Sequence, residues 1–281
     1  MTISHRLDVK KTYKLFINGA FPRSESGRTF EVLSKKGEFI ANPCLASRKD
    51  LRDAVTVARA AQSGWAKATA YNRGQILYRI AEMLEGRATQ VAAEISASTA
   101  NSPAKAASVL EAAIDRLVWY AGWSDKLSAV SGATNPVAGP YYNFTVPEPL
   151  GVVAVASSES FLDFVDAIAA AIVSGNTVIA LVSGPLSLPA MTFAEVLATS
   201  DLPAGVINIL TGSLDELAPW AASHMDIDGF DITDIPLKKR GHLKEMGAEN
   251  LKRFYISNGA QSPARILAFM EHKTVWHTIG L

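Results

Sequence analysis

The sequence predicts an α/β protein whose centre is an open, doubly wound parallel sheet. Two features of the chain indicate this class. From residue 151 onward, short apolar runs alternate with helix-like segments, which is typical of a parallel sheet covered on both faces. The chain of 281 residues is also 48% hydrophobic, so it can fill a sizeable core. Right-handed crossovers between consecutive strands would wind this sheet in both directions.

Short strands are expected near the start of the chain. Residues 13–21 fit a hairpin with its turn at Asn18 and Gly19, a pair that adopts the positive φ angles of a tight turn. Residues 29–34 and 37–42 are predicted to be two further short strands.

A layer of helices follows these strands. Ser47 is a candidate N-cap for a helix that extends to about residue 68, because apolar residues then recur at helical spacing. The segment 72–100 predicts one or two helices. Residues 103–127 predict a long amphipathic helix with Pro103 in its first turn.

A break rich in Gly, Pro and Ser covers residues 128–140. Residues 141–150 are aromatic and β-branched and therefore predict a strand. Pro147 and Pro149 argue against a central position for this strand, because proline cannot donate a hydrogen bond to a neighbour.

The remainder of the chain alternates between strands and helices. Helices are expected at 161–174, 185–200, 213–224 and 236–247. Strands are expected at 151–156, 176–183, 205–212, 227–233 and 252–259.

The charges of the chain are balanced. Lysine plus arginine and aspartate plus glutamate each number 27, so the formal net charge is zero. This balance gives no electrostatic reason to expect binding of nucleic acid or of an anionic membrane surface. The locally basic run 238–244 is interpreted as a solvated helix face. The five histidines have no metal-ligand spacing, so no metal site is predicted.

Cys44 is the only cysteine, which excludes an internal disulfide and fits a reducing, cytoplasmic environment. A lone thiol can be a nucleophile, but no histidine lies near Cys44 in the sequence, so a structural role is favoured. The N-terminus has no apolar signal segment, so we expect no secretion. The most apolar stretch, around 150–182, is too interrupted by polar residues to cross a membrane.

Eight segments, in order along the chain, resemble one family, the NAD(P)-dependent aldehyde dehydrogenases. The resemblance implies a Rossmann-like cofactor domain, an N-terminal helical layer and a projecting β-ribbon that bridges subunits. The expected units are residues 1–134, the ribbon of 135–150 plus 266–281, and the cofactor domain 151–265. The segments are "FINGAF", "DAVTVARAA", "YNRGQILYRIAEMLEGR", "PEPLGVVAVA", "GNTVIAL", "DLPAGVINILTG", "SHMDID" and "LKRFYISNGAQSP".

The chain departs from the family pattern after Pro263. In the family, the segment that resembles residues 251–263 leads into a second α/β domain, which carries the nucleophilic cysteine. Here it leads to residues 266–281, in which Lys273–Trp276 resembles the last bridging strand of the family. The sequence therefore predicts a natural design in which the catalytic domain is excised and the final strand is kept.

The family's catalytic positions are also altered. Its acyl transfer needs a thiolate, a general base and a side-chain amide at the oxyanion site. By resemblance, the base glutamate falls on Ser257 and the amide-bearing asparagine on Ser160, beside Glu159. A serine hydroxyl is not a carboxylate base at neutral pH, so no catalytic residue is predicted in this chain.

The cofactor positions are altered as well. The family's ribose-binding Lys and Glu fall on Leu181 and Gly184, and the Gly of its phosphate-binding Thr-Gly-Ser falls on Asp234. Asp234 is expected to cap the following helix itself. Lost charged hydrogen bonds of ~1.5–3 kcal/mol each imply an NAD or NADP affinity reduced by a factor of roughly 10² to 10⁴. The remaining contacts of a vestigial site are Ser158, Ser160, Ser183 and Gly212.

Three functions remain open. The chain is predicted to be a non-catalytic structural or regulatory subunit of a complete aldehyde dehydrogenase. The alternatives are an NAD(P)-binding sensor and an oxidoreductase to which a partner chain supplies the cysteine. The expected partner is the complete enzyme or, when the protein is alone, a second copy. The predicted interface residues of the ribbon are Tyr142, Phe144, Val146, Lys273, Val275 and Trp276.

Overall fold

The computed structural model describes residues 9–99 and 101–280. Its centre is a five-stranded parallel sheet in the order β7-β6-β5-β8-β9. The chain starts in the middle with β5, moves outward through β6 and β7, and returns to add β8 and β9 on the other side. The predicted open, doubly wound sheet is therefore confirmed. The strands are β5 (Val152–Ser157), β6 (Thr177–Val182), β7 (Ile207–Thr211), β8 (Gly229–Asp231) and β9 (Arg253–Tyr255).

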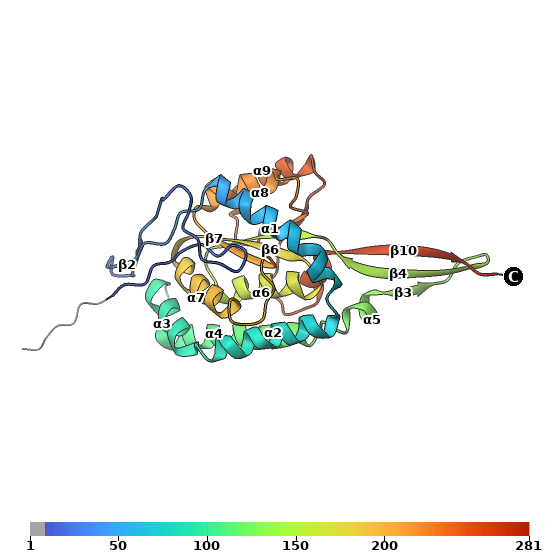
Figure 1. Ribbon diagram of the computed structural model, residues 1–281, viewed down its shortest axis with the longest axis horizontal. Helices are drawn as coiled ribbons and strands as arrows, with labels where there is room; N and C mark the ends of the chain where they lie inside the picture. The colour runs from blue at the N-terminus through green and yellow to red at the C-terminus, as the bar shows by residue number, and fades with distance from the viewer. Residues whose placement is uncertain (1–8, 100, 281) are drawn as a thin grey trace, which may run out of the picture.

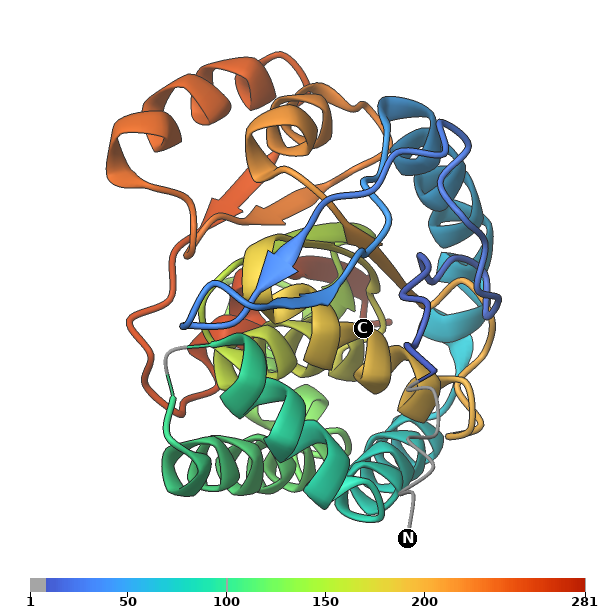
Figure 2. The same cartoon turned by 90° about the vertical axis from the view of Figure 1, so that its left-hand side faces the viewer.

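Helices cover both faces of the sheet, as Figures 1 and 2 show. One face packs against α6 (Phe161–Val173) and α7 (Ser187–Leu197), which continues a short 3₁₀ turn, η1 (Gly184–Leu186). The opposite face packs against three helices, and alternate β5 residues such as Val153 and Ala154 enter the two separate cores. These helices are α1 (Arg48–Lys67), α8 (Leu214–Ser223) and α9 (Leu237–Ala248).

The N-terminal helices form a further layer outside α6 and α7 (Figure 1). They are α2 (Ala70–Glu85), α3 (Ala88–Ser98) and α4 (Pro103–Ala121). Ser47 caps α1 in a capping box with Asp50, as expected. Pro103 lies in the first turn of α4, whose N-cap is Ser102.

The predicted hairpin and short strands are present. Ile17 bridges Ala20 in antiparallel fashion, and Asn18 and Gly19 have φ angles of 54° and 74°. These positive angles explain why that dipeptide occupies the turn. The strands β1 (Val32–Leu33) and β2 (Phe39–Ala41) pair with each other.

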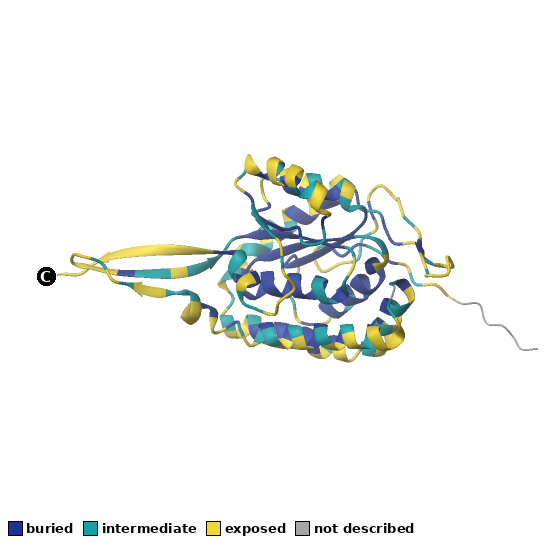
Figure 3. Cartoon of the chain, turned by 180° about the vertical axis from the view of Figure 1, so that it is seen from behind, coloured by how far each residue is buried: buried dark blue, intermediate teal, exposed yellow. Residues whose placement is uncertain are grey.

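A three-stranded antiparallel ribbon projects from the body, and its surface is mostly exposed (Figures 1 and 3). Its order is β10-β4-β3, with Met270 opposite Pro149 at the root and Thr278 opposite Tyr141 at the tip. The strands are β3 (Ala133–Asn135), β4 (Tyr141–Pro149) and β10 (Met270–Thr278).

The expectation that β4 is not a central strand was wrong. β4 pairs with β10 along its whole length and with β3 over residues 143–145. Pro147 and Pro149 lie beyond the residues that pair with β3, so neither proline has to donate a hydrogen bond on that side. Two short helices, α5 (Leu127–Ser131) and α10 (Ala264–Ala268), precede β3 and β10 and were not predicted.

Over the ranges that the structure describes, no helix is both long enough and apolar enough to cross a membrane.

Candidate functional site

A cleft of about 460 Å³ lies at the carboxyl ends of β5, β6 and β7. Ser158 follows β5, Ser183 follows β6 and Gly212 follows β7, and the structure brings all three into this cleft. This edge is where doubly wound sheets hold ligands, because the loops there diverge on either side of the first strand. Ser160 does not line the cleft. Its Oγ instead caps α6, accepting the backbone N–H of Asp163 at 3.2 Å.

Three carboxylates also line the cleft, from Glu159, Asp215 and Asp234. Asp215 forms an ion pair with Lys239 of α9. Burial raises the pKa of Asp234 above its ordinary value, against the opposing effect of a backbone hydrogen bond from Ser158. The cleft therefore carries negative charge at the edge where a dinucleotide would present its phosphates.

The expectation that Asp234 caps α9 was wrong. The N-cap of α9 is Pro236, and no side chain caps that helix. The Asp234 carboxylate instead accepts the backbone N–H of Ser158 at 2.9 Å, and the backbone of Glu159 also hydrogen-bonds to it. Asp234 lies two residues before the N-cap Pro236 of α9. Its side chain extends to the turn between β5 and α6.

The two positions expected to have lost the ribose contacts differ in their surroundings. Leu181 is fully buried in the apolar core between the sheet and α1 and α8, and it does not line the cleft. Gly184 does line it, at the start of η1 with a φ of 60°. No charged side chain comes from either position.

The degenerate catalytic positions are held by local hydrogen bonds. Ser257 donates its backbone N–H to Thr233 Oγ1 at 2.8 Å, and its own Oγ accepts the N–H of Gly259 at 3.1 Å. Within residues 9–99 and 101–280, no hydrogen bond joins Ser257 to Ser160.

Cys44 is 5% exposed and belongs to the core on the α1 side of the sheet. Its N–H donates to the carbonyl of Tyr13 at 3.1 Å, and its own carbonyl accepts Thr211 Oγ1 at 2.6 Å. Its neighbour Leu45 reaches the cleft, but Cys44 itself does not line it.

A buried ionic network lies beside Thr233 and was not predicted. Arg265 of α10 donates to Asp166 of α6 at 2.5 Å and to Asp231 of β8 at 2.7 Å. Asp166 also accepts hydrogen bonds from Arg116 and Tyr120, both on α4. The signal that could have revealed it is Asp166 itself, a carboxylate within the otherwise apolar helix α6.

Burial alone would lower the pKa of Arg265, but Asp231 and Asp166 raise it above its ordinary value. Burial and the Asp166 carboxylate raise the pKa of the Tyr120 hydroxyl. Both groups therefore keep their protons.

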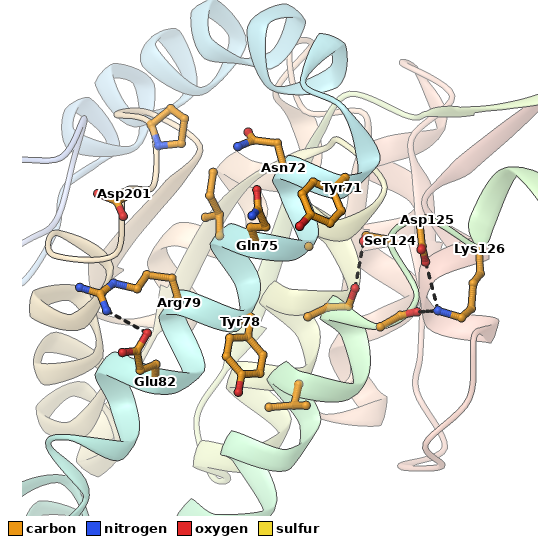
Figure 4. Close-up of a pocket in the computed structure, with 16 residues that line it drawn as sticks. Tyr71, Asn72, Gln75, Tyr78, Arg79, Glu82, Ser124, Asp125, Lys126 and Asp201 are labelled. Carbon is orange, nitrogen blue, oxygen red and sulfur yellow. Dashed lines mark hydrogen bonds and ion pairs between the residues drawn. The ribbon is translucent and has the colours of Figure 1, made fainter.

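A larger groove, of about 900 Å³, lies between α2 and α4 and is shown in Figure 4. Five charged side chains line it, and four of them form two ion pairs, Arg79 with Glu82 at 2.8 Å and Lys126 with Asp125 at 3.1 Å. The fifth is Asp201. None of the residues predicted from the sequence as a site lines this groove. In the described part of the chain, no group of three or more His, Cys, Asp or Glu could hold a metal ion.

Comparison with known proteins shows which family the chain is similar to. Residues 21–279 match the model of the aldehyde dehydrogenase family. Retinal dehydrogenase 2 of Gallus gallus is 35% identical over 270 residues, which are 93% of this chain and 51% of that protein. An aldehyde dehydrogenase of Emericella nidulans is 32% identical over 273 residues, which are 95% of this chain and 54% of that protein. The chain thus spans about half the length of the curated relatives it matches.

Solved structures agree with the sequence comparison. The NAD⁺ complex of an aldehyde dehydrogenase from Bacillus cereus has a TM-score of 0.81 and 26% identity, over 88% of this chain and 50% of that one. An NAD-dependent aldehyde dehydrogenase from Sinorhizobium meliloti has a TM-score of 0.82, over 90% of this chain and 51% of that one. Its 24% identity speaks for the fold alone. The chain described here belongs to the aldehyde dehydrogenase family.

Proposed function

We propose that this chain is a non-catalytic member of the family that docks onto a complete aldehyde dehydrogenase as a structural or regulatory subunit. The observation that carries the proposal is the projecting ribbon, which offers both an open strand edge and an exposed apolar face. The family resemblance implies a ribbon that bridges subunits, and in the present chain β4 and β10 pair along their whole length to form such a ribbon.

The two faces of the ribbon differ in chemistry. Successive side chains of a strand point to opposite faces, so the register of β4 and β10 assigns each residue to a face. We name the apolar face by its residues Tyr142, Phe144, Val146, Val275 and Ile279. His277, opposite Tyr142, also points to this face. Lys273 shares this face, where it pairs with Glu148 at 2.7 Å. Trp276 lies on the opposite face, against Tyr141, with ring centroids 5.7 Å apart.

The apolar face is open to solvent. Tyr142 is 48% exposed, Val275 40% and Ile279 51%. Soluble proteins normally cover large apolar side chains that gather on one exposed face, so this face fits a binding surface. Five of the six residues predicted as interface belong to this face, and only Trp276 does not.

The outer edge of β10 supports the same proposal. β10 is the edge strand of the ribbon, and among its nine residues only Met270 is buried. The N–H and C=O groups along such an edge can pair with a strand of another chain. A sheet of a complete aldehyde dehydrogenase is the acceptor we propose.

Among its described residues, this chain does not present the thiol, the general base and the side-chain amide of the family's reaction together in the cleft. The single cysteine, Cys44, is buried in a core beside the cleft and does not line it. Ser257 offers a hydroxyl where a base is needed, and Ser160 uses its hydroxyl to cap α6. These observations favour a non-catalytic role over an oxidoreductase completed by a partner's cysteine. The NAD(P)-binding sensor is the second candidate, and what supports it is only the position of the cleft at the carboxyl ends of β5, β6 and β7.

Affinity purification of the tagged chain from native extract tests the docking proposal. The expected result is recovery of a complete aldehyde dehydrogenase in a stoichiometric amount, identified by mass spectrometry. Val275→Asp should abolish recovery, because it places a charge on the apolar face. Thr274→Asp is the matched control, since its side chain points to the opposite face of the same strand.

Two outcomes would count against the proposal. If Val275→Asp still co-purifies stoichiometrically with the enzyme, the apolar face is not the docking element. If the wild-type chain never recovers such an enzyme, the partner itself is wrong.

A further inference from the structure

We propose that Asp234 is an internal occupant of an anion site formed by the backbone amides of Ser158 and Glu159, and that this carboxylate excludes phosphate-bearing ligands from the cleft. This inference concerns the cleft and does not depend on the docking of the ribbon.

The contact that carries the inference joins distant parts of the chain. Asp234 follows β8, whereas Ser158 and Glu159 form the turn between β5 and α6. The Oδ2 atom of Asp234 accepts the N–H of Ser158 at 2.9 Å, and the backbone of Glu159 also hydrogen-bonds to the carboxylate. One carboxylate therefore accepts the Ser158 amide and lies next to the Glu159 amide, which also favours its charged form.

Successive backbone amides just before a helix are a general anion-binding arrangement. Their N–H groups converge, and the dipole of the helix that follows favours negative charge. Here that helix is α6, which has 13 residues. An anion already occupies this arrangement in the structure, and it belongs to the chain itself.

The rest of the cleft would still admit a ligand. It has a volume of about 460 Å³, and Ser183 and Ser213 line it beside Ser158. Its charge, however, opposes phosphate. Lys239 neutralises Asp215, but within residues 9–99 and 101–280 no ion pair neutralises Glu159 or Asp234.

The residues present therefore do not fit a dinucleotide, although relatives such as the Bacillus cereus enzyme are known as NAD⁺ complexes. A pyrophosphate that entered the cleft would meet a carboxylate on the amides that should receive it. The cleft itself is still present. The pyrophosphate does not fit because the Asp234 carboxylate competes with it for the same backbone N–H donors.

The test is a titration of the full ¹⁵N-labelled chain with inorganic pyrophosphate and, separately, with NAD. Calorimetry measures the affinity, and the amide shifts of Ser158 and Glu159 report the site. In the wild-type protein at neutral pH, millimolar pyrophosphate should shift neither amide. In Asp234→Gly, pyrophosphate should bind at least about tenfold more tightly, and both amides should shift. NAD should gain affinity in the same variant.

Asp215→Asn is the matched control, because it removes a carboxylate from the same cleft without freeing an amide. Its affinity should remain that of the wild type. If the wild-type amides respond to pyrophosphate, or if Asp234→Gly binds no more tightly than Asp215→Asn, the inference is overturned. Should Asp234→Gly fail to fold, Asp234→Ala replaces it, because it also removes the acceptor of the Ser158 N–H. Its failure to exceed Asp215→Asn has the same meaning.

Discussion

Arg265 donates two hydrogen bonds to one oxygen of Asp231, from Nε at 2.9 Å and from Nη2 at 2.7 Å. Arg265 belongs to α10, which leads into the ribbon, and Asp231 ends β8 in the centre of the body. The third contact, to Asp166, adds α6. This guanidinium therefore fastens the segment between β9 and the ribbon to β8 and α6 of the central α/β body.

Replacement of Arg265 should be strongly destabilising. Arg265→Met would leave Asp166 and Asp231 buried with a partner removed, since they are 3% and 1% exposed. Removing one partner of a buried ionic pair costs about 3–5 kcal/mol in the free energy of unfolding. Urea denaturation followed by circular dichroism measures this loss.

The matched control is Arg52→Met, which removes an exposed partner of Asp53. Exposed pairs contribute up to about 1 kcal/mol, so this variant should unfold almost as the wild type does. Equal stability of the two variants would show that the network does not fasten the fold.

Local pattern was sufficient for the elements of the main sheet. Val152–Ser157 and Thr177–Val182 are apolar runs with the length of a buried parallel strand, and the segment between them has helical periodicity. β3 could not be recognised in this way. Its three residues lie in a break rich in Gly and Pro, and pairing with β4 alone makes them a strand.

The site was predictable only in part, because some of its contacts join residues that are far apart in the sequence. Ser158, Ser183 and Gly212 follow strands, so the topology of a parallel sheet places them at one edge. The partner of Asp234 is 76 residues away in sequence, and no local signal distinguishes that contact from a helix cap. Asp166 and Arg265 are 99 residues apart and meet only through the tertiary fold.

Lys252 should make stability depend on pH. Burial lowers its pKa to about 8 from the ordinary value of 10.5, while Asp228 opposes this shift and Arg59 adds to it. Between these two values the unfolded chain binds more protons at this site than the folded chain does, so this contribution to stability rises with pH. In Lys252→Met that rise should be absent.

The measurement is the free energy of unfolding of both proteins from pH 7.5 to pH 9.5. The wild type should gain about 1–2 kcal/mol relative to Lys252→Met over this range. A constant difference would mean that Lys252 does not change its protonation on unfolding in this range.

Asp234 should make stability depend on pH in the direction opposite to that of Lys252. Its raised pKa means that the folded chain binds the proton more tightly, so its contribution to stability falls as the pH rises above the ordinary value of 3.8. Asp234→Asn removes this effect. The melting temperature of the variant relative to the wild type should therefore increase between pH 3 and pH 7. Glu159 and Asp163, which also raise the pKa of Asp234, remain in both proteins.

The isolated chain should not reduce NAD or NADP with any aldehyde. The measurement is nicotinamide absorbance with a panel of aldehydes, for the wild type and for Cys44→Ala. Because Cys44 is buried and does not line the cleft, both proteins should give the same background. Turnover that disappears in Cys44→Ala would contradict the non-catalytic assignment.

The two faces of the ribbon should differ when the protein is purified alone. Without a complete enzyme to receive it, the apolar face is left in water, and a second copy can cover it. Sedimentation should therefore show a homodimer.

Val275→Asp should weaken dimerisation at least about tenfold. It places a charge where the wild type has a valine, whose full burial is worth about 1.5–3 kcal/mol. Trp276→Ala should change dimerisation little, although Trp276 is 60% exposed, because its ring packs against Tyr141 on the other face. If Trp276→Ala dissociates the dimer and Val275→Asp does not, copies associate through the opposite face and the apolar face has another occupant.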